Sequence, residues 1–314
     1  MDSSQNHTSD DRAVEANDEH FKVLIPAVVL SVIAMAIGTL GNSIALYIFR
    51  FRYKPSNHRC FILSLATFDL LFDLFGIPFM IVEMRLSYIF PSAAACKVHR
   101  FINYSYGCGS GLTVMTIAID RYLKICKSNR TQITPKLAKG LCFLLAFIGI
   151  LVALPSLELY GQYIVQKKKN ITIIQCLPQN KYEENPLFHT LYNGFLAFCF
   201  ITTVVTISIC YTLIVRRVAS QSLSVVKLHR VAKMLFVVTA VFFVTYIPYF
   251  SVIITVYANK NYKEDWSKTG EAFFEVFWRS FLINTFANPI IYGFMDKKFR
   301  VECKTLLYRF INRG

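Results

Sequence analysis

The sequence predicts an all-α membrane protein, a bundle of seven transmembrane helices that ends in a short amphipathic eighth helix. The composition is the first observation, because 54% of the 314 residues are apolar and 17% are charged. Soluble domains carry about 25% charged residues. The second observation is a mean hydropathy of +0.43. The third is a series of long apolar spans that lack the alternating pattern of membrane barrels.

Five of these spans contain no Asp, Glu, Lys or Arg, and two more appear when buried ionisable residues are allowed. Each can reach the roughly 20 residues that a helix needs to cross the hydrocarbon core. In chain order they cover residues 23–49, 60–82, 101–119, 140–157, 187–215, 234–259 and 272–295. The second span contains Asp69 and Asp73, and Pro248 and Pro289 are expected to kink the sixth and seventh.

The distribution of charge predicts how the chain is oriented. When the spans are crossed in turn, one side of the membrane holds 21 of the 34 Lys and Arg residues, and the positive-inside rule makes that side the cytoplasm. Residues 1–21 are then an extracellular tail, residues 22–295 the transmembrane domain, and residues 296–314 an amphipathic helix with a short cytoplasmic tail. Topology and anionic lipid account for the net charge of +15, so no nucleic-acid partner is expected.

Three residues are candidates for modification. The sequons at Asn6 and Asn170 fall on the predicted outer side and are glycosylation candidates, with an unused triplet as the alternative. Cys303 lies in the basic amphipathic segment and is a palmitoylation candidate, with a plain buried thiol as the alternative. The segment itself is expected to lie on the inner leaflet, so membrane lipid is one partner.

Several polar residues are predicted to lie at the depth of the membrane centre. Asp69 needs a polar partner or an ion there, and the candidates at comparable depth are Ser110, Asn284 and Asn288. Asn284 and Asn288 share one helix face because they are four residues apart. One interpretation is a hydrogen-bonded polar core that holds helices together. The sharper one is a hydrated cation pocket with Asp69 as its charged ligand.

Motifs at fixed places in the spans carry a resemblance to a known family. They are Gly41-Asn42, Leu65-Ala66-x-x-Asp69, Cys96 at the start of the third span with Cys176 in the following outer loop, Asp120-Arg121-Tyr122, Tyr211, Phe242, Pro248 and Asn288-Pro289-x-x-Tyr292. With these motifs the chain resembles the rhodopsin-like class of G-protein-coupled receptors over all seven spans, in its peptide-receptor or orphan branch.

The resemblance implies a mechanism and a set of site residues. An extracellular ligand favours a state in which the sixth helix swings outward at its cytoplasmic end, about a pivot formed by Phe242, Tyr246 and Pro248. A heterotrimeric G protein then enters a cleft, and the coupling and switch residues are Asp120, Arg121, Tyr122, Tyr211, Asn288, Pro289 and Tyr292. A disulfide between Cys96 and Cys176 is implied, as is an allosteric sodium ion at Asp69, Ser110, Asn284 and Asn288, and no other cofactor or metal is expected.

The sequence also departs from the family pattern. Tyr246 stands where the family has its toggle tryptophan, which puts a standard toggle in doubt. Leu228 stands where some members have an acid that pairs with the conserved arginine. We therefore expect Arg121 to be held mainly by Asp120, and basal activity to be appreciable.

The ligand class is predicted partly by exclusion. Asn103 replaces the aspartate of aminergic members, and Leu282 replaces the lysine of photopigments. Residues 160–165 and 171–176 are predicted to form a hairpin, as peptide-binding members of the family have. The residues expected to line the ligand pocket are Glu83, Asn103, Tyr104, Gly107, Tyr246, Tyr249, Trp278 and Arg279.

Arg279 has two expected partners, a ligand carboxylate or an acid within the protein, Glu83 or Glu275. A neuropeptide-type ligand is the preferred prediction for this plasma-membrane receptor. The alternatives are a chemosensory or small-molecule receptor of the same fold, a non-signalling decoy or a transporter. No enzyme activity is predicted, because no acid-base or metal cluster is found at membrane depth.

Overall fold

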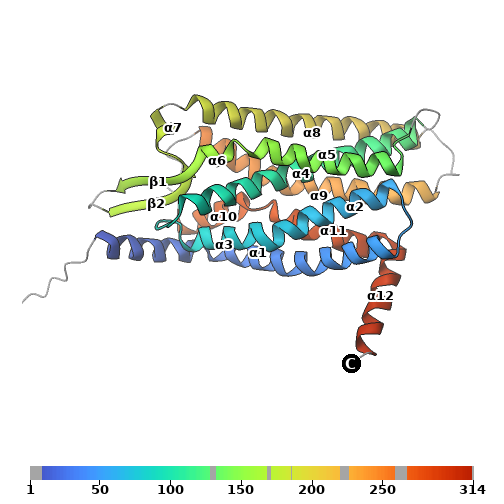
Figure 1. Ribbon diagram of the computed structural model, residues 1–314, viewed down its shortest axis with the longest axis horizontal. Coiled ribbons are helices and arrows are strands. Elements are labelled where there is room, and N and C mark those ends of the chain that lie inside the picture. Colours follow the sequence, from blue (N-terminus) through green and yellow to red (C-terminus); the bar gives the residue numbers. More distant parts are fainter. Residues whose placement is uncertain are drawn as a thin grey trace, which may run out of the picture.

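The computed structural model describes residues 9–127, 132–167, 171–184, 186–219, 226–258 and 267–312. Its long helices run side by side along one axis, with a β-hairpin at one end and the last helix at the other (Figure 1). We call these the hairpin end and the α12 end. The fold is all-α apart from the hairpin, as the long apolar spans predict.

The transmembrane helices follow the predicted spans. They are α1 (Ser9–Phe51), α2, η1 and α3 (Asn57–Leu71, Phe72–Gly76 and Ile77–Arg85), α4 (Ala93–Cys126), α5 with the short α6 (Pro135–Ala153 and Ser156–Leu159), α8 (Leu187–Ala219), α9 (Val226–Ala258), and α10 with α11 (Lys268–Trp278 and Leu282–Met295). Among the described residues, five spans are long and apolar enough to cross a membrane by these criteria alone. The third span, α4, is not among these five because it contains many polar residues. The seventh is not among them because it is divided into α10 and α11 at residues 279–281.

The first helix begins earlier than predicted. The sequence suggests a tail over residues 1–21, but α1 already begins at Ser9. Asn17 is fully buried. Its amide donates to the Arg85 carbonyl at 2.9 Å, and its Oδ1 accepts from the Tyr88 N–H at 3.0 Å. Acidic residues in the first turns stabilise a helix N-terminus, so residues 9–21 continue the helix and pack on the hairpin end.

The predicted hairpin is present. β1 (Tyr160–Lys167) and β2 (Ile171–Pro178) pair antiparallel, and Gln162 lies opposite Cys176. The Phe90 N–H donates to the Ile174 carbonyl at 2.9 Å, which ties the loop after α3 to β2. A short helix, α7 (Lys181–Glu184), follows the hairpin and leads to α8. The hairpin is thus anchored to the bundle by its β2 strand.

The last helix, α12 (Lys297–Ile311), turns away from the bundle axis (Figure 1). Asp296 caps it, because its Oδ1 accepts from the N–H groups of Lys298 and Phe299 at 2.9 and 3.1 Å. Phe299 is buried against the bundle, whereas Leu307 is 63% exposed. Further along, Tyr308 and Ile311 are also exposed, so α12 presents apolar side chains outward, as an amphipathic helix does.

Candidate functional site

At the α12 end, a buried ionic cluster surrounds Asp120 on α4. Asp120 and Arg121 form an ion pair and are 1% and 4% exposed. Lys124 lies 3.1 Å from the same carboxylate. The Asn57 amide donates to the other carboxylate oxygen at 2.6 Å and to the Ile133 carbonyl at 2.7 Å. Asp120 therefore holds Arg121 and is itself held by α2, which fits the expectation that Asp120 is the main partner of Arg121.

A second contact joins α8 to α9 at this end. The hydroxyl groups of Tyr211 and Thr239 lie 3.2 Å apart, and both residues are buried. The Tyr211 ring also meets Phe236 edge-on, with ring centroids 5.1 Å apart. An outward swing of α9 must break these contacts. The side chain of Leu228, at the start of α9, lies outside the described residues.

The seventh span reaches the same region through Tyr292. Its side chain is fully buried, and its ring centroid lies 5.5 Å from Phe49 and 6.1 Å from Phe299. Its hydroxyl has no hydrogen-bond partner among the described residues. A buried hydroxyl without a partner costs roughly 1–3 kcal/mol, so this rotamer is held by ring packing against α1 and α12. Tyr122 lies partly buried beside the same core.

The middle of α9 carries an aromatic cluster in place of a toggle tryptophan. The Tyr246 ring lies 4.5 Å from Phe242 and 6.1 Å from Phe281, centroid to centroid. One turn before Pro248, the Thr245 carbonyl accepts from the Ser280 hydroxyl at 2.7 Å. The part of α9 around Pro248 is thereby tied to the turn between α10 and α11.

The polar core lies around Asp69, which is fully buried. Asp69 Oδ1 accepts from the Tyr106 hydroxyl at 3.1 Å, and Oδ2 accepts from the Asn288 amide at 2.9 Å. The Asn284 amide lies 3.4 Å from the same Tyr106 hydroxyl. Among the described residues, the Ser110 hydroxyl and Asn288 Oδ1 have no partner.

The oxygen atoms of this core fit a sodium ion in part. Among the described residues, Ser110 Oγ and Asn288 Oδ1 are buried and have no hydrogen-bond partner, and both belong to residues that the sequence analysis grouped with Asp69. A carboxylate in the membrane costs roughly 2.5–3.5 kcal/mol and needs compensation. No ion pair of Asp69 or Asp73 occurs in the described part of the chain. The Tyr106 phenol, which sequence analysis did not single out, supplies part of that compensation.

At the hairpin end, Glu83 is the centre of a second ionic cluster. It forms an ion pair with Arg100, and its other oxygen lies 2.8 Å from His99 Nε2. Arg100 also donates to the Cys176 carbonyl at 2.8 Å and lies over the Tyr160 ring, 5.3 Å from its centroid. Glu83 was predicted to line the pocket, but its two partners were not foreseen. Both partners lie on α4 just before the predicted third span, within four residues of Asn103.

The disulfide implied by the family resemblance joins Cys96 to Cys176, with Cα atoms 5.4 Å apart. Next to it, the Tyr104 and Tyr160 hydroxyls lie 2.6 Å apart, so α4 is linked to β2 by the disulfide and to β1 by this contact. One helical turn further along α4, Gly107 has open space where a side chain would project. The Asn103 amide lies 3.0 Å from His99 Nε2, and its carbonyl oxygen has no partner among the described residues.

The remaining pocket candidates lie on α9 and α10. Arg279 pairs with Glu275 at 2.6 Å, one of the two acids foreseen as partners within the protein. Both side chains are about one-tenth exposed. Tyr249 meets Trp278 edge-on, with centroids 5.9 Å apart. These predicted pocket residues therefore share one end of the bundle, while Tyr246 lies deeper.

Tyr53 and Cys303, which lie outside the membrane spans, have raised pKa values. Burial, followed by the hydrogen bond to Asp296 at 2.7 Å, raises the pKa of Tyr53. Burial also raises the pKa of the Cys303 thiol, which packs partly against the core of the bundle. The glycosylation candidates Asn6 and Asn170 lie outside the described residues.

Sequence comparison decides the family. The profile described as 7 transmembrane receptor (rhodopsin family) matches residues 41–292. The chain belongs to this rhodopsin family. The receptor is 28% identical over 94% of its length to a C3a anaphylatoxin chemotactic receptor of Oncorhynchus mykiss, covering 80% of that protein.

Two other relatives of this receptor are similar to a comparable degree. One is a neuropeptide Y receptor type 2 of Mus musculus, 24% identical over 84% of the chain and 71% of that protein. The other is a C-C chemokine receptor type 3 of Macaca fascicularis, 27% identical over 88% of the chain and 77% of that protein. The receptor is accordingly a multi-pass protein of the plasma membrane and not an enzyme.

Proposed function

We propose that this receptor binds a peptide at the hairpin end and activates a heterotrimeric G protein at the α12 end. The observation that carries the proposal is the buried Asp120–Arg121 pair, braced by Asn57 and Lys124. A buried charged pair is costly unless it is fully hydrogen-bonded, so its retention at a helix end favours a switch over mere stabilisation. Arg121 lies on the helix that also carries Arg100 of the hairpin-end cluster.

The orientation belongs to the same proposal. The hairpin and residues 9–21 face the outside, and α12 lies on the inner leaflet. Support comes from the excess of basic residues among the loops at the α12 end. The exposed apolar residues of α12 support the membrane contact.

A peptide fits the hairpin end better than a small amine does. The hairpin is anchored by the disulfide, by Arg100 and by the loop at Phe90. The paired charges of Glu83 with Arg100 and of Glu275 with Arg279 offer both signs to a ligand with its own charged groups. The names of the relatives, which include anaphylatoxin, neuropeptide and chemokine receptors, agree with a peptide ligand. We propose the neuropeptide-type ligand on this basis.

Sodium binding at the polar core is part of the same proposal. Asp69 would supply the charge, with Ser110 Oγ, Asn288 Oδ1 and Asn284 as neighbouring polar groups. The ion supplies a counter-charge that favours the inactive packing. Tyr106 donates to Asp69 and competes with the ion for that oxygen. A binding assay with purified receptor and ²²Na⁺ tests this, with Asp69→Asn as the variant expected to lose the ion.

The function is tested by ligand-free and peptide-stimulated G-protein activation in transfected cells. Arg121→Ala is compared with the wild type and with Arg50→Ala, an exposed arginine at the same end, at matched surface levels. We expect the Arg121→Ala signal to disappear and the Arg50→Ala signal to remain. Equal signals from all three would refute coupling through Arg121. A response to small molecules but to no peptide would instead support the chemosensory alternative.

A further inference from the structure

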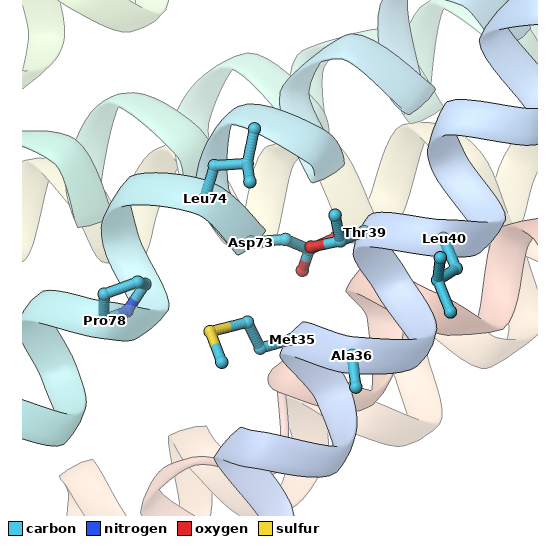
Figure 2. Close-up of a pocket in the computed structure, with 7 residues that line it drawn as sticks. All are labelled: Met35, Ala36, Thr39, Leu40, Asp73, Leu74 and Pro78. Carbon is cyan, nitrogen blue, oxygen red and sulfur yellow. The ribbon is translucent and has the colours of Figure 1, made fainter.

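A groove of about 370 Å³ lies on the outer side of the bundle, between α1 and the η1–α3 part of the second span (Figure 2). Met35, Ala36 and Thr39 line it from α1, and Asp73 and Leu74 line it from η1. Leu74 is 47% exposed although it belongs to a transmembrane span. The groove therefore opens toward lipid and is reached from the bilayer.

Asp73 differs from the rest of this lining. Its side chain is fully buried, and Figure 2 shows it directed across the groove toward α1 beside Thr39. Among the described residues, Asp73 Oδ1 has no hydrogen-bond partner. Oδ2 accepts from the Asn42 amide at 3.3 Å, which is a long hydrogen bond. An acid within the membrane that lacks a counter-charge points to a functional site.

The backbone is adapted to place this carboxylate. Asp73 lies in the π-helical turn Phe72–Gly76, and such turns often mark functional sites. On α1, a Cβ atom at Gly38 would come within 2.3 Å of Asp73 Oδ2 and 2.8 Å of Oδ1. Only glycine admits the carboxylate at that distance. The close approach between α1 and η1 leaves the carboxylate at the base of the groove.

We propose that this groove binds a small lipophilic amine from the bilayer, with its ammonium group on Asp73 Oδ1. An ammonium group supplies the missing hydrogen-bond donor and the missing positive charge together, and charge-assisted bonds are the strong ones. The hydrocarbon part of the ligand packs on Ala36, Leu74 and Met35, and the unbranched Met35 side chain adapts to its shape. An acyl chain would fill the same volume but leave the carboxylate oxygen unpaired.

The bound amine is connected to the switch helix. The Asn42 amide that contacts Asp73 also donates to the Thr285 carbonyl on α11, at 2.8 Å. α11 carries Asn288, Pro289 and Tyr292. This site is distinct from the pocket residues at the hairpin end, so the amine and the proposed peptide do not compete for the same residues.

The test uses purified full-length receptor in lipid nanodiscs and a pair of probes with one shape. The probes are tritium-labelled 1-adamantylamine and 1-methyladamantane, which differ by an ammonium group against a methyl group. We expect saturable binding of the amine at least about 10-fold tighter than that of the hydrocarbon. Asp73→Asn keeps the size of the side chain and should abolish the difference while leaving the affinity of the hydrocarbon unchanged.

Two further variants separate this site from others and from misfolding. Ala36→Phe fills the groove from α1 without changing Asp73 and should weaken binding of both probes. Asp69→Asn alters the neighbouring acid and should keep the preference for the amine over the hydrocarbon. Equal affinities for the two probes in the wild type would overturn the proposal and leave the groove as an ordinary lipid contact. Loss of amine preference in Asp69→Asn, with Asp73→Asn unchanged, would overturn it as well.

Discussion

Gly38→Ala is the substitution whose consequence the structure determines most directly. The added Cβ would lie 2.3 Å from Oδ2, 2.7 Å from Cγ and 2.8 Å from Oδ1 of Asp73. All three distances are shorter than an ordinary van der Waals contact. Asp73 has only two side-chain torsions, and rotation away from α1 breaks its bond to Asn42. Overpacking of this kind costs about 1–3 kcal/mol.

Thermal unfolding of the purified receptor measures this cost. At roughly 2–4 °C for each kcal/mol in a large domain, we expect the apparent melting temperature of Gly38→Ala to fall by several degrees. Gly140→Ala is the matched control, because a Cβ there has no heavy atom within 4 Å. Alanine is the better helix former by about 1 kcal/mol, so this control should be neutral or slightly stabilising.

A double-mutant cycle identifies the cause. Asp73→Ala removes the three atoms that the new Cβ would meet, so Gly38→Ala should cost little in that background. We expect a coupling free energy of about 1–3 kcal/mol between the two positions. A Gly38→Ala variant as stable as the wild type, or one equally destabilised with and without Asp73→Ala, would refute the close approach of α1 and η1.

Three other predictions concern the two ends of the bundle. Tyr211→Phe and Thr239→Val should each cost about 1 kcal/mol and raise basal signalling, and the double variant should add nothing further; additive effects would show that the two hydroxyls are not partners. Arg100→Ala leaves the buried Glu83 carboxylate without its arginine partner and should lower stability by about 3–5 kcal/mol, seen as lost surface expression that an added Glu83→Gln substitution partly restores. Burial raises the pKa of the Cys303 thiol, so the rate at which maleimide labels Cys303, taken as the difference between the wild type and Cys303→Ser, should be low at neutral pH. This rate should increase only at a pH above that at which an ordinary thiol ionises. A labelling rate equal to that of a free thiol at neutral pH would contradict the partial burial of Cys303.

The hydropathy pattern was sufficient for the transmembrane segments. A span must be long and apolar to cross lipid, and both properties can be read from consecutive residues. The hairpin was predictable because it too is local: its two strands are adjacent in sequence. The helix over residues 9–21 was not predicted, because Asn17 is held by Arg85 and Tyr88, which are distant in the sequence.

The motifs also singled out Asp120 and Arg121, which we propose as switch residues and which form an ion pair in the structure. Asp120 and Arg121 are neighbours in the chain, so their pairing is local. The residue that braces them from α2 is Asn57, 63 positions away, and no local pattern points to it. Tyr106 at the polar core was missed for a similar reason, because one tyrosine among many in an apolar span gives no signal by itself.

What the sequence by itself determined is therefore the number and order of the membrane spans, the hairpin and the identity of the family. The tertiary structure alone decided which partners the buried polar groups take: Glu275 for Arg279 and Tyr106 for Asp69, while Asp73 Oδ1 has no hydrogen-bond partner among the described residues. The physical reason is that composition and periodicity determine where a helix runs. The rotation of each helix about its axis, and the close approach that a residue such as Gly38 permits, depend on packing between segments far apart in the chain.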